Sequence, residues 1–312
     1  MKNNTEWLSG CATALVTPFT NDGAIDEACL RDLIERQIAG GVGILVPCGT
    51  TGESATMATE EDQRVIRIAV EMAQGRAKVI AGASNNNTRF AIRNARNAAL
   101  LGADAVMFAA PYYNKPTQAG LYAHYRAIAE ALPETPIVIY NVPGRSAVNV
   151  KAETTLRLAH DCANIVAVKE ASGDVSQIMD ILRDRPAGFR VFSGDDALTL
   201  ALIALGADGL VSVISNETPD LTAQLVNACL AGEWDKAREL HYKLLPLMNA
   251  NFMETSPGPV KAVMKMQGLL EETLRLPLVP VEENTRETLR GIAQELGLIQ
   301  EIEPQMNTDA HR

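Results

Sequence analysis

The strongest constraint on the fold is a regular alternation of short apolar runs with amphipathic segments. Between Gly10 and Gly232 the two kinds of segment alternate eight times, and Leu-Gly-Ala-Asp recurs at 101–104 and 205–208 as the same helix-to-strand turn. Apolar runs bounded by turn residues are typical of strands buried on both faces. Strands are expected at 11–16, 42–46, 78–83, 104–109, 136–140, 165–169, 189–192 and 208–213.

Eight strand–helix units in about 230 residues fit a closed (β/α)8 barrel. We therefore predict an α/β fold, with a TIM barrel over residues 1–231 and a C-terminal three-helix appendage over 232–312. A doubly wound sheet is the alternative. It is disfavoured because the chain lacks a Gly-x-Gly-x-x-Gly motif and because polar residues end every strand, not only two neighbouring ones.

The C-terminal appendage is expected to form helices at 233–250, 259–268 and 285–296. Pro246 should kink or break the first of these, because proline has no N–H to donate. We expect this region to serve packing or assembly more than chemistry. Residues after Glu301 are polar and are expected to fray.

Composition limits the possible partners. A formal net charge of −10 argues against nucleic acid and anionic membranes. The five cysteines are scattered and form no metal motif with the histidines, so reduced thiols in a cytosol fit best. No signal peptide or membrane span is recognisable. We expect a soluble cytoplasmic protein that binds no metal.

Lys169 is the most informative single residue, because it ends the apolar run that begins at Ile165. A lysine at a buried strand end has its stem in an apolar wall, and desolvation disfavours its charged form. A neutral amine can condense with a carbonyl to give a Schiff base. The structural alternative is a lysine that only extends from the strand end into water.

Polar residues follow the other strands too, and in a barrel all strand carboxyl ends meet at one mouth. Such residues can bind a carboxylate or carry protons, although each could instead close a turn, fill the barrel or face solvent. Asp195 and Asp196 resemble a metal pair, but we favour helix N-cap and first-turn roles for them. The residues expected at the mouth are Thr17, Thr50, Thr51, Tyr112, Tyr113, Tyr140, Arg145, Lys169 and Gly194.

Five motifs in this order resemble those of the dihydrodipicolinate synthase family, part of the N-acetylneuraminate lyase superfamily of class I pyruvate aldolases. The resemblance covers nearly the whole chain. It implies a lyase that needs no cofactor, in which Lys169 forms a Schiff base with pyruvate and the enamine attacks L-aspartate 4-semialdehyde. The product belongs to the diaminopimelate and lysine pathway. The motifs are Gly-Thr-Thr-Gly-Glu at 49–53, Tyr-Tyr-Asn-Lys-Pro at 112–116, Tyr-Asn-Val-Pro-Gly-Arg at 140–145, Val-Lys-Glu-Ala-Ser-Gly at 168–173 and Ser-Gly-Asp-Asp at 193–196.

The resemblance also assigns roles to residues. Tyr140 would donate and accept protons, with Thr50 and Tyr113 completing a relay. Tyr113 would enter from a neighbouring subunit, so a homodimer is the smallest active unit and a homotetramer is usual. The remaining substrate contacts would come from Thr51 and the Val211 backbone (pyruvate carboxylate), Arg145 (aldehyde carboxylate) and Gly194.

Feedback by lysine is expected to be weak or absent. Lysine-inhibited members of the family use a histidine and a glutamate where this chain has Asp62 and Phe90, and phenylalanine cannot accept a hydrogen bond from an ammonium. Two other functions remain open: a sibling aldolase acting on a sugar acid such as N-acetylneuraminate, and a non-catalytic barrel that binds a keto acid. The allosteric positions that do match the family are Ser54, Ala55, Asn86 and Tyr112.

Overall fold

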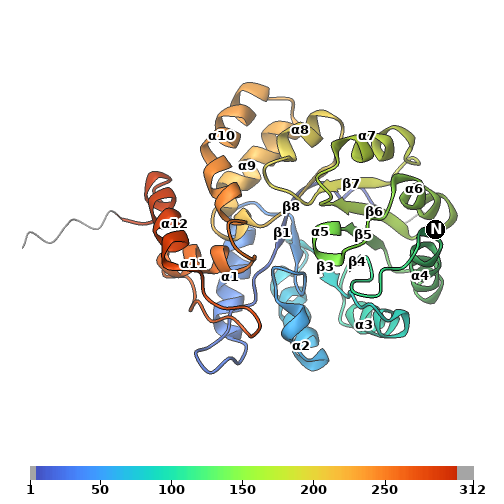
Figure 1. The fold of residues 1–312 in the computed structure, drawn as a ribbon, viewed down its shortest axis with the longest axis horizontal. Helices are drawn as coiled ribbons and strands as arrows, with labels where there is room; N and C mark the ends of the chain where they lie inside the picture. The colour runs from blue at the N-terminus through green and yellow to red at the C-terminus, as the bar shows by residue number, and fades with distance from the viewer. Residues whose placement is uncertain (1–4, 301–312) are drawn as a thin grey trace, which may run out of the picture.

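A computed structural model describes residues 5–300 of the chain, so the expectation for the tail after Glu301 lies outside the described residues. Eight parallel strands pair in sequence order, and β8 pairs with β1 to close a barrel (Figure 1). This confirms the predicted (β/α)8 fold and excludes the doubly wound sheet. The strands are β1 (Gly10–Ala14), β2 (Ile44–Val46), β3 (Lys78–Gly82), β4 (Ala105–Ala109), β5 (Ile137–Asn141), β6 (Ile165–Glu170), β7 (Arg190–Ser193) and β8 (Gly209–Ser212).

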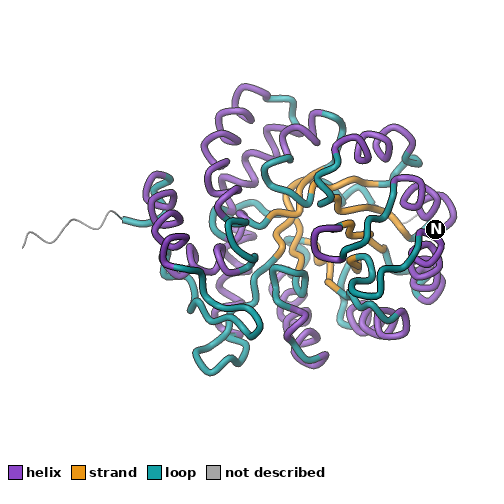
Figure 2. Tube along the Cα trace, in the orientation of Figure 1, coloured by secondary structure: helices purple, strands orange, loops and turns teal. Residues whose placement is uncertain are grey.

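Helices surround the barrel and follow its strands (Figure 2). The first begins one residue after Asp26, whose side chain accepts a hydrogen bond from the Cys29 N–H, as expected for an N-cap. The helices of the barrel are α1 (Glu27–Ala39), α2 (Thr59–Ala73), α3 (Thr88–Leu100), α4 (Gln118–Ala131), α6 (Ala152–Asp161), α7 (Val175–Asp184), α8 (Thr199–Ala204) and α9 (Pro219–Leu230).

Two apolar layers hold the strands in place. Side chains that point outward from the strands pack against the helices, and those that point inward fill the barrel. Each strand therefore buries both faces, which is why the strands read as continuous apolar runs in the sequence. The inner layer includes Tyr140, Val211 and Phe192, all at most 7% exposed.

Three short elements lie in the loops that follow strands, and the sequence did not predict them. They tighten the loops at the carboxyl ends of β2, β5 and β8, so they shape the mouth of the barrel. They are η1 (Ser54–Thr56), α5 (Pro143–Ser146) and η2 (Ile214–Asn216).

The C-terminal region is helical, as expected. It consists of α10 (Trp234–Ala250), α11 (Gly258–Met266) and α12 (Glu283–Glu295), with α10 packed against α9. α10 continues through Pro246, so the expectation of a break is wrong, and that of a kink stays a prediction. Burial of Leu244, Leu247 and Met248 contributes about 1.5–3 kcal/mol each and outweighs the roughly 3 kcal/mol that an interior proline costs. The boundary at residue 231 stays a prediction.

Candidate active site

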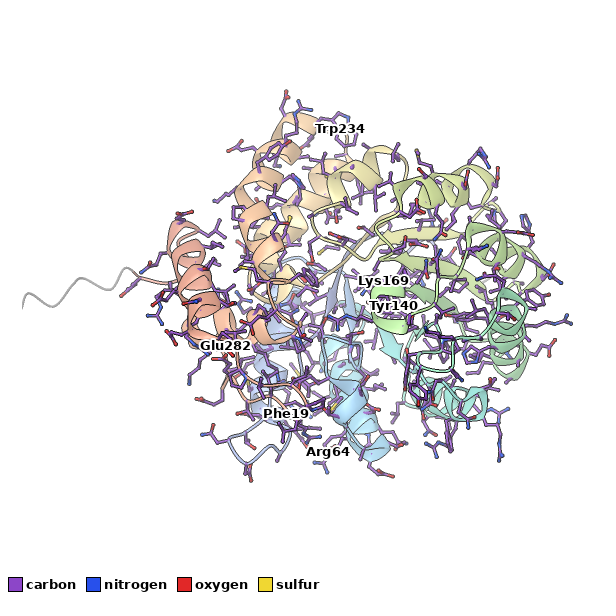
Figure 3. The ribbon with its side chains drawn as sticks, viewed as in Figure 1. Phe19, Arg64, Tyr140, Lys169, Trp234 and Glu282 are labelled. Atoms are coloured by element: carbon purple, nitrogen blue, oxygen red, sulfur yellow. The ribbon has the colours of Figure 1, made fainter. Side chains whose placement is uncertain are left out.

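Lys169 and Tyr140 lie side by side at the carboxyl ends of adjacent strands. They are register partners on β5 and β6, and the Lys169 Nζ lies 4.2 Å from the centroid of the Tyr140 ring. Figure 3 labels both near the centre of the barrel. Lys169 is 5% exposed. Within residues 5–300 the Tyr140 ring is its only partner, since the amine makes no hydrogen bond or ion pair there.

Gly194 makes room for the lysine. A Cβ at this position would lie 2.9 Å from the Lys169 Cε and 2.8 Å from the Ala171 Cβ, closer than real contacts allow. The Gly194 N–H donates to the Glu170 carbonyl oxygen at 2.6 Å, which fixes this approach. Glycine is therefore the residue that lets the lysine side chain pass.

The carboxyl group next to the lysine points away from it. Glu170 accepts hydrogen bonds from Asn141 Nδ2 at 2.8 Å, Ser172 Oγ at 2.7 Å and Gln177 Nε2 at 3.1 Å. Burial raises the pKa of Glu170, and these donors oppose the rise. The network ties β5 to β6 and leaves Lys169 without a carboxylate neighbour on its own strand.

A cavity of about 140 Å³ lies over Lys169. It brings together six of the residues expected at the mouth: Thr50, Thr51, Tyr140, Arg145, Lys169 and Gly194. The other lining residues are not among those predicted from the sequence. These are Val142, Ala171, Asp195, Val213, Phe252 and Ser256.

Two of the unexpected residues, Phe252 and Ser256, come from the segment between α10 and α11. The C-terminal region therefore forms part of the site, which the expectation that it serves packing or assembly more than chemistry did not include. Arg145, on α5, donates a long hydrogen bond of 3.5 Å from Nη2 to the Ser256 carbonyl oxygen. Among the described residues Arg145 has no carboxylate partner, so its guanidinium group is available to bind an anion.

The two threonines differ in exposure. Thr51 is 5% exposed and Thr50 is open to solvent. Thr17, also expected at the mouth, is buried and donates its hydroxyl proton to the Gly52 carbonyl oxygen at 2.7 Å. Thr17 therefore supports the turn that presents the threonines, and it does not line the cavity.

Two other candidates, Val211 and Tyr113, do not line the cavity over Lys169. Val211 lies in the inner layer of the barrel, and Val213 lines the cavity in its place. Tyr113 is 90% exposed, with a left-handed φ of 72°.

Asp195 caps the turn before α8, where its Oδ1 accepts hydrogen bonds from the Ala197 and Leu198 N–H groups at 2.9 and 3.4 Å. Asp196 is not in a first helical turn, because α8 begins only at Thr199. Instead it is buried and accepts hydrogen bonds from Ser212 Oγ and the Val213 N–H at 2.5 and 2.9 Å, and burial raises its pKa to about 6. Asp196 is therefore structural, whereas Asp195 caps the turn and also lines the cavity over Lys169. Within residues 5–300 no group of three or more His, Cys, Asp or Glu side chains could hold a metal ion.

A second cavity, of about 470 Å³, adjoins the first and shares Thr50, Tyr140 and Arg145 with it. Three of the allosteric candidates, Ser54, Ala55 and Tyr112, line it together with Asp62. The fourth, Asn86, does not line it but donates through Nδ2 to the Tyr112 carbonyl oxygen at 3.2 Å. Burial raises the pKa of Asp62 to about 7.

A closed barrel with a cavity at the carboxyl ends of its strands, and in it a buried lysine that has no ion-pair partner among residues 5–300, defines the class of (β/α)8 barrel enzymes. The family model described as the dihydrodipicolinate synthetase family matches residues 7–296, and the chain belongs to that family.

Individual relatives agree with this assignment. The 4-hydroxy-tetrahydrodipicolinate synthase of Koribacter versatilis is 53% identical over 293 residues, covering 94% of this chain and 97% of the relative. A solved dihydrodipicolinate synthase described as the first monomeric variant is 42% identical, with a TM-score of 0.92 over 95% of this chain and 99% of its own. The enzyme of Cyanidioschyzon merolae, solved with lysine bound, is 38% identical, with a TM-score of 0.91 over 94% of this chain and 99% of its own.

Among residues 5–300, none of the helices has both the length and the apolar character that a membrane-spanning helix requires.

Proposed function

We propose that this chain is a lyase with 4-hydroxy-tetrahydrodipicolinate synthase activity, which condenses pyruvate with L-aspartate 4-semialdehyde through a Schiff base on Lys169. The observation that carries the proposal is the buried Lys169 amine, which lies against Tyr140 in a small cavity and has no carboxylate partner within residues 5–300. The relative from Koribacter versatilis bears the name of this activity at 53% identity. The proposed reaction places the protein in the diaminopimelate and lysine pathway of the cytoplasm.

The covalent steps of the proposed reaction take place on the side chain of Lys169. Its nitrogen adds to the keto carbon of pyruvate, and loss of water gives an iminium ion. Loss of a proton from the methyl group gives an enamine, whose carbon forms the new bond to the aldehyde carbon. The amine of the second substrate then displaces the lysine nitrogen as the ring closes, so the enzyme is regenerated without a cofactor.

Neighbouring residues would move protons and hold carboxylates. Tyr140, whose ring touches the amine, would carry protons during addition and loss of water, with Thr50 as the next hydroxyl. Thr51, with the backbone at Val211, would hold the pyruvate carboxylate. Arg145 would bind the carboxylate of the aldehyde substrate through its fork. Gly194 would contribute by leaving room for the lysine side chain.

Tyr113 would reach the relay from a second copy of the chain, so we propose a homo-oligomer, either a dimer or a tetramer built as a dimer of dimers. The supporting observation is a 90% exposed tyrosine held at a φ of 72° beside the barrel mouth of its own chain. One solved neighbour is described as a monomeric variant, so assembly needs its own measurement. Sedimentation of wild type and Tyr113→Ala together with their activities will test it: full activity in a monomer would contradict the proposal.

Borohydride trapping tests the central step. Wild type incubated with pyruvate and borohydride should gain a reduced pyruvyl adduct on Lys169, seen by mass spectrometry, and Lys169→Ala should gain none. The activity of Lys169→Ala should fall by about 10³ or more, the loss typical when a nucleophile is removed. Trapping on another residue, or none in wild type, would overturn the proposal. A parallel assay of aspartate semialdehyde against N-acetylneuraminate separates the synthase from a sibling aldolase.

A further inference from the structure

We propose that Lys261 and Arg275, both from the C-terminal region, are positioning residues for the threonine turn (residues 49–53) that carries Thr50 and Thr51. The inference rests on the proposed function, in which these threonines act beside Lys169. It assigns to the C-terminal region a part in the chemistry that goes beyond assembly.

A fully buried ion pair joins the two regions. The Lys261 Nζ, on α11, donates to the Glu53 Oε1 at 2.5 Å, and both side chains are 0% exposed. The same amine donates to the Thr273 carbonyl oxygen at 2.9 Å. A buried charge that loses its partner is strongly unfavourable, so Glu53 can keep its place only while Lys261 keeps its own.

Glu53 in turn sets the shape of the threonine turn. Its backbone has a φ of 56°, in the left-handed region that a glutamate rarely adopts. Its N–H donates to the Thr50 carbonyl oxygen at 3.1 Å, which closes the turn. A strained backbone of this kind persists only where its surroundings over-determine it. The second carboxylate oxygen, Oε2, accepts the Arg275 N–H at 3.2 Å, so the C-terminal region binds both oxygens.

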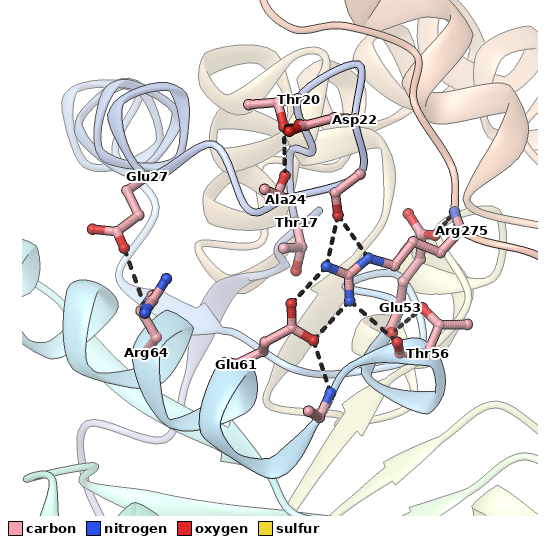
Figure 4. Close-up of polar contacts among 12 residues, drawn as sticks. Thr17, Thr20, Asp22, Ala24, Glu27, Glu53, Thr56, Glu61, Arg64 and Arg275 are labelled. Atoms are coloured by element: carbon pink, nitrogen blue, oxygen red, sulfur yellow. Dashed lines mark hydrogen bonds and ion pairs between the residues drawn. The ribbon is translucent and has the colours of Figure 1, made fainter.

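The side chain of Arg275 binds the segment that follows the turn and the loop that precedes α1 (Figure 4). Its fork binds both oxygens of Glu61 on α2, at 2.6 and 2.8 Å, and lowers the pKa of that carboxyl to about 2. It also donates to the carbonyl oxygens of Gly23 and Thr56. The guanidinium carbon of Arg275 and the amine of Lys261 each lie 4.4 Å from the centroid of the buried Phe19 ring.

This arrangement makes the threonine turn an extension of a rigid network. Thr50 and Thr51 line the cavity over Lys169, and a shift of about 1 Å in such groups can lower a rate by about a hundredfold. If the network served only to dock the C-terminal region, its loss would lower the melting temperature and leave the kinetics of the folded enzyme unchanged. The two roles therefore predict different measurements.

The first test compares two arginine variants in the full-length chain. Arg275→Gln should lower kcat by about tenfold or more and slow borohydride trapping with pyruvate by a similar factor. Arg286→Gln is the matched control, because Arg286 also makes a two-pronged ion pair, with Glu272, but away from the turn. It should lower only the melting temperature. If Arg275→Gln fails to fold, Arg275→Lys, which keeps the charge, carries the test.

The second test is a double-mutant cycle. Because Arg275 acts through the turn, Arg275→Gln should slow the Thr50→Val/Thr51→Val enzyme much less than it slows the wild-type enzyme. Additive losses, or unchanged kcat in a folded Arg275 variant, would overturn the inference. Failure of wild type to trap pyruvate would instead overturn the proposed function, so the two failures are distinguishable.

Discussion

At the scale of single residues, the absence of a side chain at Gly194 governs the path of Lys169. A Cβ there would lie 2.9 Å from the Lys169 Cε, so Gly194→Ala must displace the amine. We expect kcat/KM for pyruvate to fall by about a hundredfold, as for other misplacements near 1 Å. Steady-state kinetics will measure the loss.

Gly291→Ala is the control for this substitution. It adds the same methyl group within α12, where nothing lies within 4 Å. This variant should keep full activity and gain about 0.5–1 kcal/mol of stability from helix propensity. Equal activity of the two alanine variants would show that Gly194 does not constrain the lysine.

Some residues of the candidate site could be predicted from the sequence and others could not. Lys169, Tyr140 and Arg145 could be placed together because a barrel brings all strand carboxyl ends to one mouth. Phe252 could not, because it reaches the cavity only when the C-terminal region folds back over the barrel, and local periodicity does not encode that packing. Asp196 was misplaced because its partner, Ser212, lies on the neighbouring strand β8.

At the scale of elements, the first turn of α3 bears on regulation. Phe90 presents an exposed ring there, and the Arg93 guanidinium lies 4.7 Å from its centroid. An apolar ring covered by a cation offers no anion to the ammonium of a lysine effector. We expect millimolar lysine to inhibit the wild-type activity weakly or not at all. Inhibition at micromolar lysine would contradict this.

Two substitutions on α3 sharpen that prediction. Phe90→Glu places a carboxylate where an ammonium could approach, and should increase inhibition by lysine. Phe90→Gln is the control, since it is polar but uncharged and should leave the lysine response close to that of wild type. Initial rates over a lysine titration will measure both, with the basal activity of each variant as reference.

Elements were predicted more reliably than their ends. The apolar runs located all eight strands because each strand buries both faces. The short helix η1 was missed because it is bound by a residue far away in the sequence, through the hydrogen bond from Arg275 to the Thr56 carbonyl oxygen. Pro246 does not break α10, because burial of the apolar side chains of this helix outweighs the local cost of a proline.

At the scale of the whole molecule, buried carboxyls set the pH dependence of stability. Burial raises the pKa of Asp62 to about 7 and of Asp196 to about 6, and raises that of Glu217 well above its usual value. Between the ordinary carboxyl range near 4 and these values, the folded chain holds more protons than the unfolded chain. The free energy of unfolding should therefore receive a contribution from these groups that falls as the pH rises from about 4 to about 7.

Asp62→Asn isolates one part of this effect. Asp62 lines a cavity, and its Oδ1 has no hydrogen-bond partner within residues 5–300, so an amide should fit without losing a contact of that atom. Because the variant cannot ionise there, its stability relative to wild type should rise as the pH increases from about 4 to about 7 and then level off. Denaturant unfolding of both proteins at pH 4.5, 6 and 8 will measure the difference in stability. These pH values bracket the window in which Asp62 keeps its proton in the folded state. A difference that stays constant across this range would mean that Asp62 ionises alike in both states.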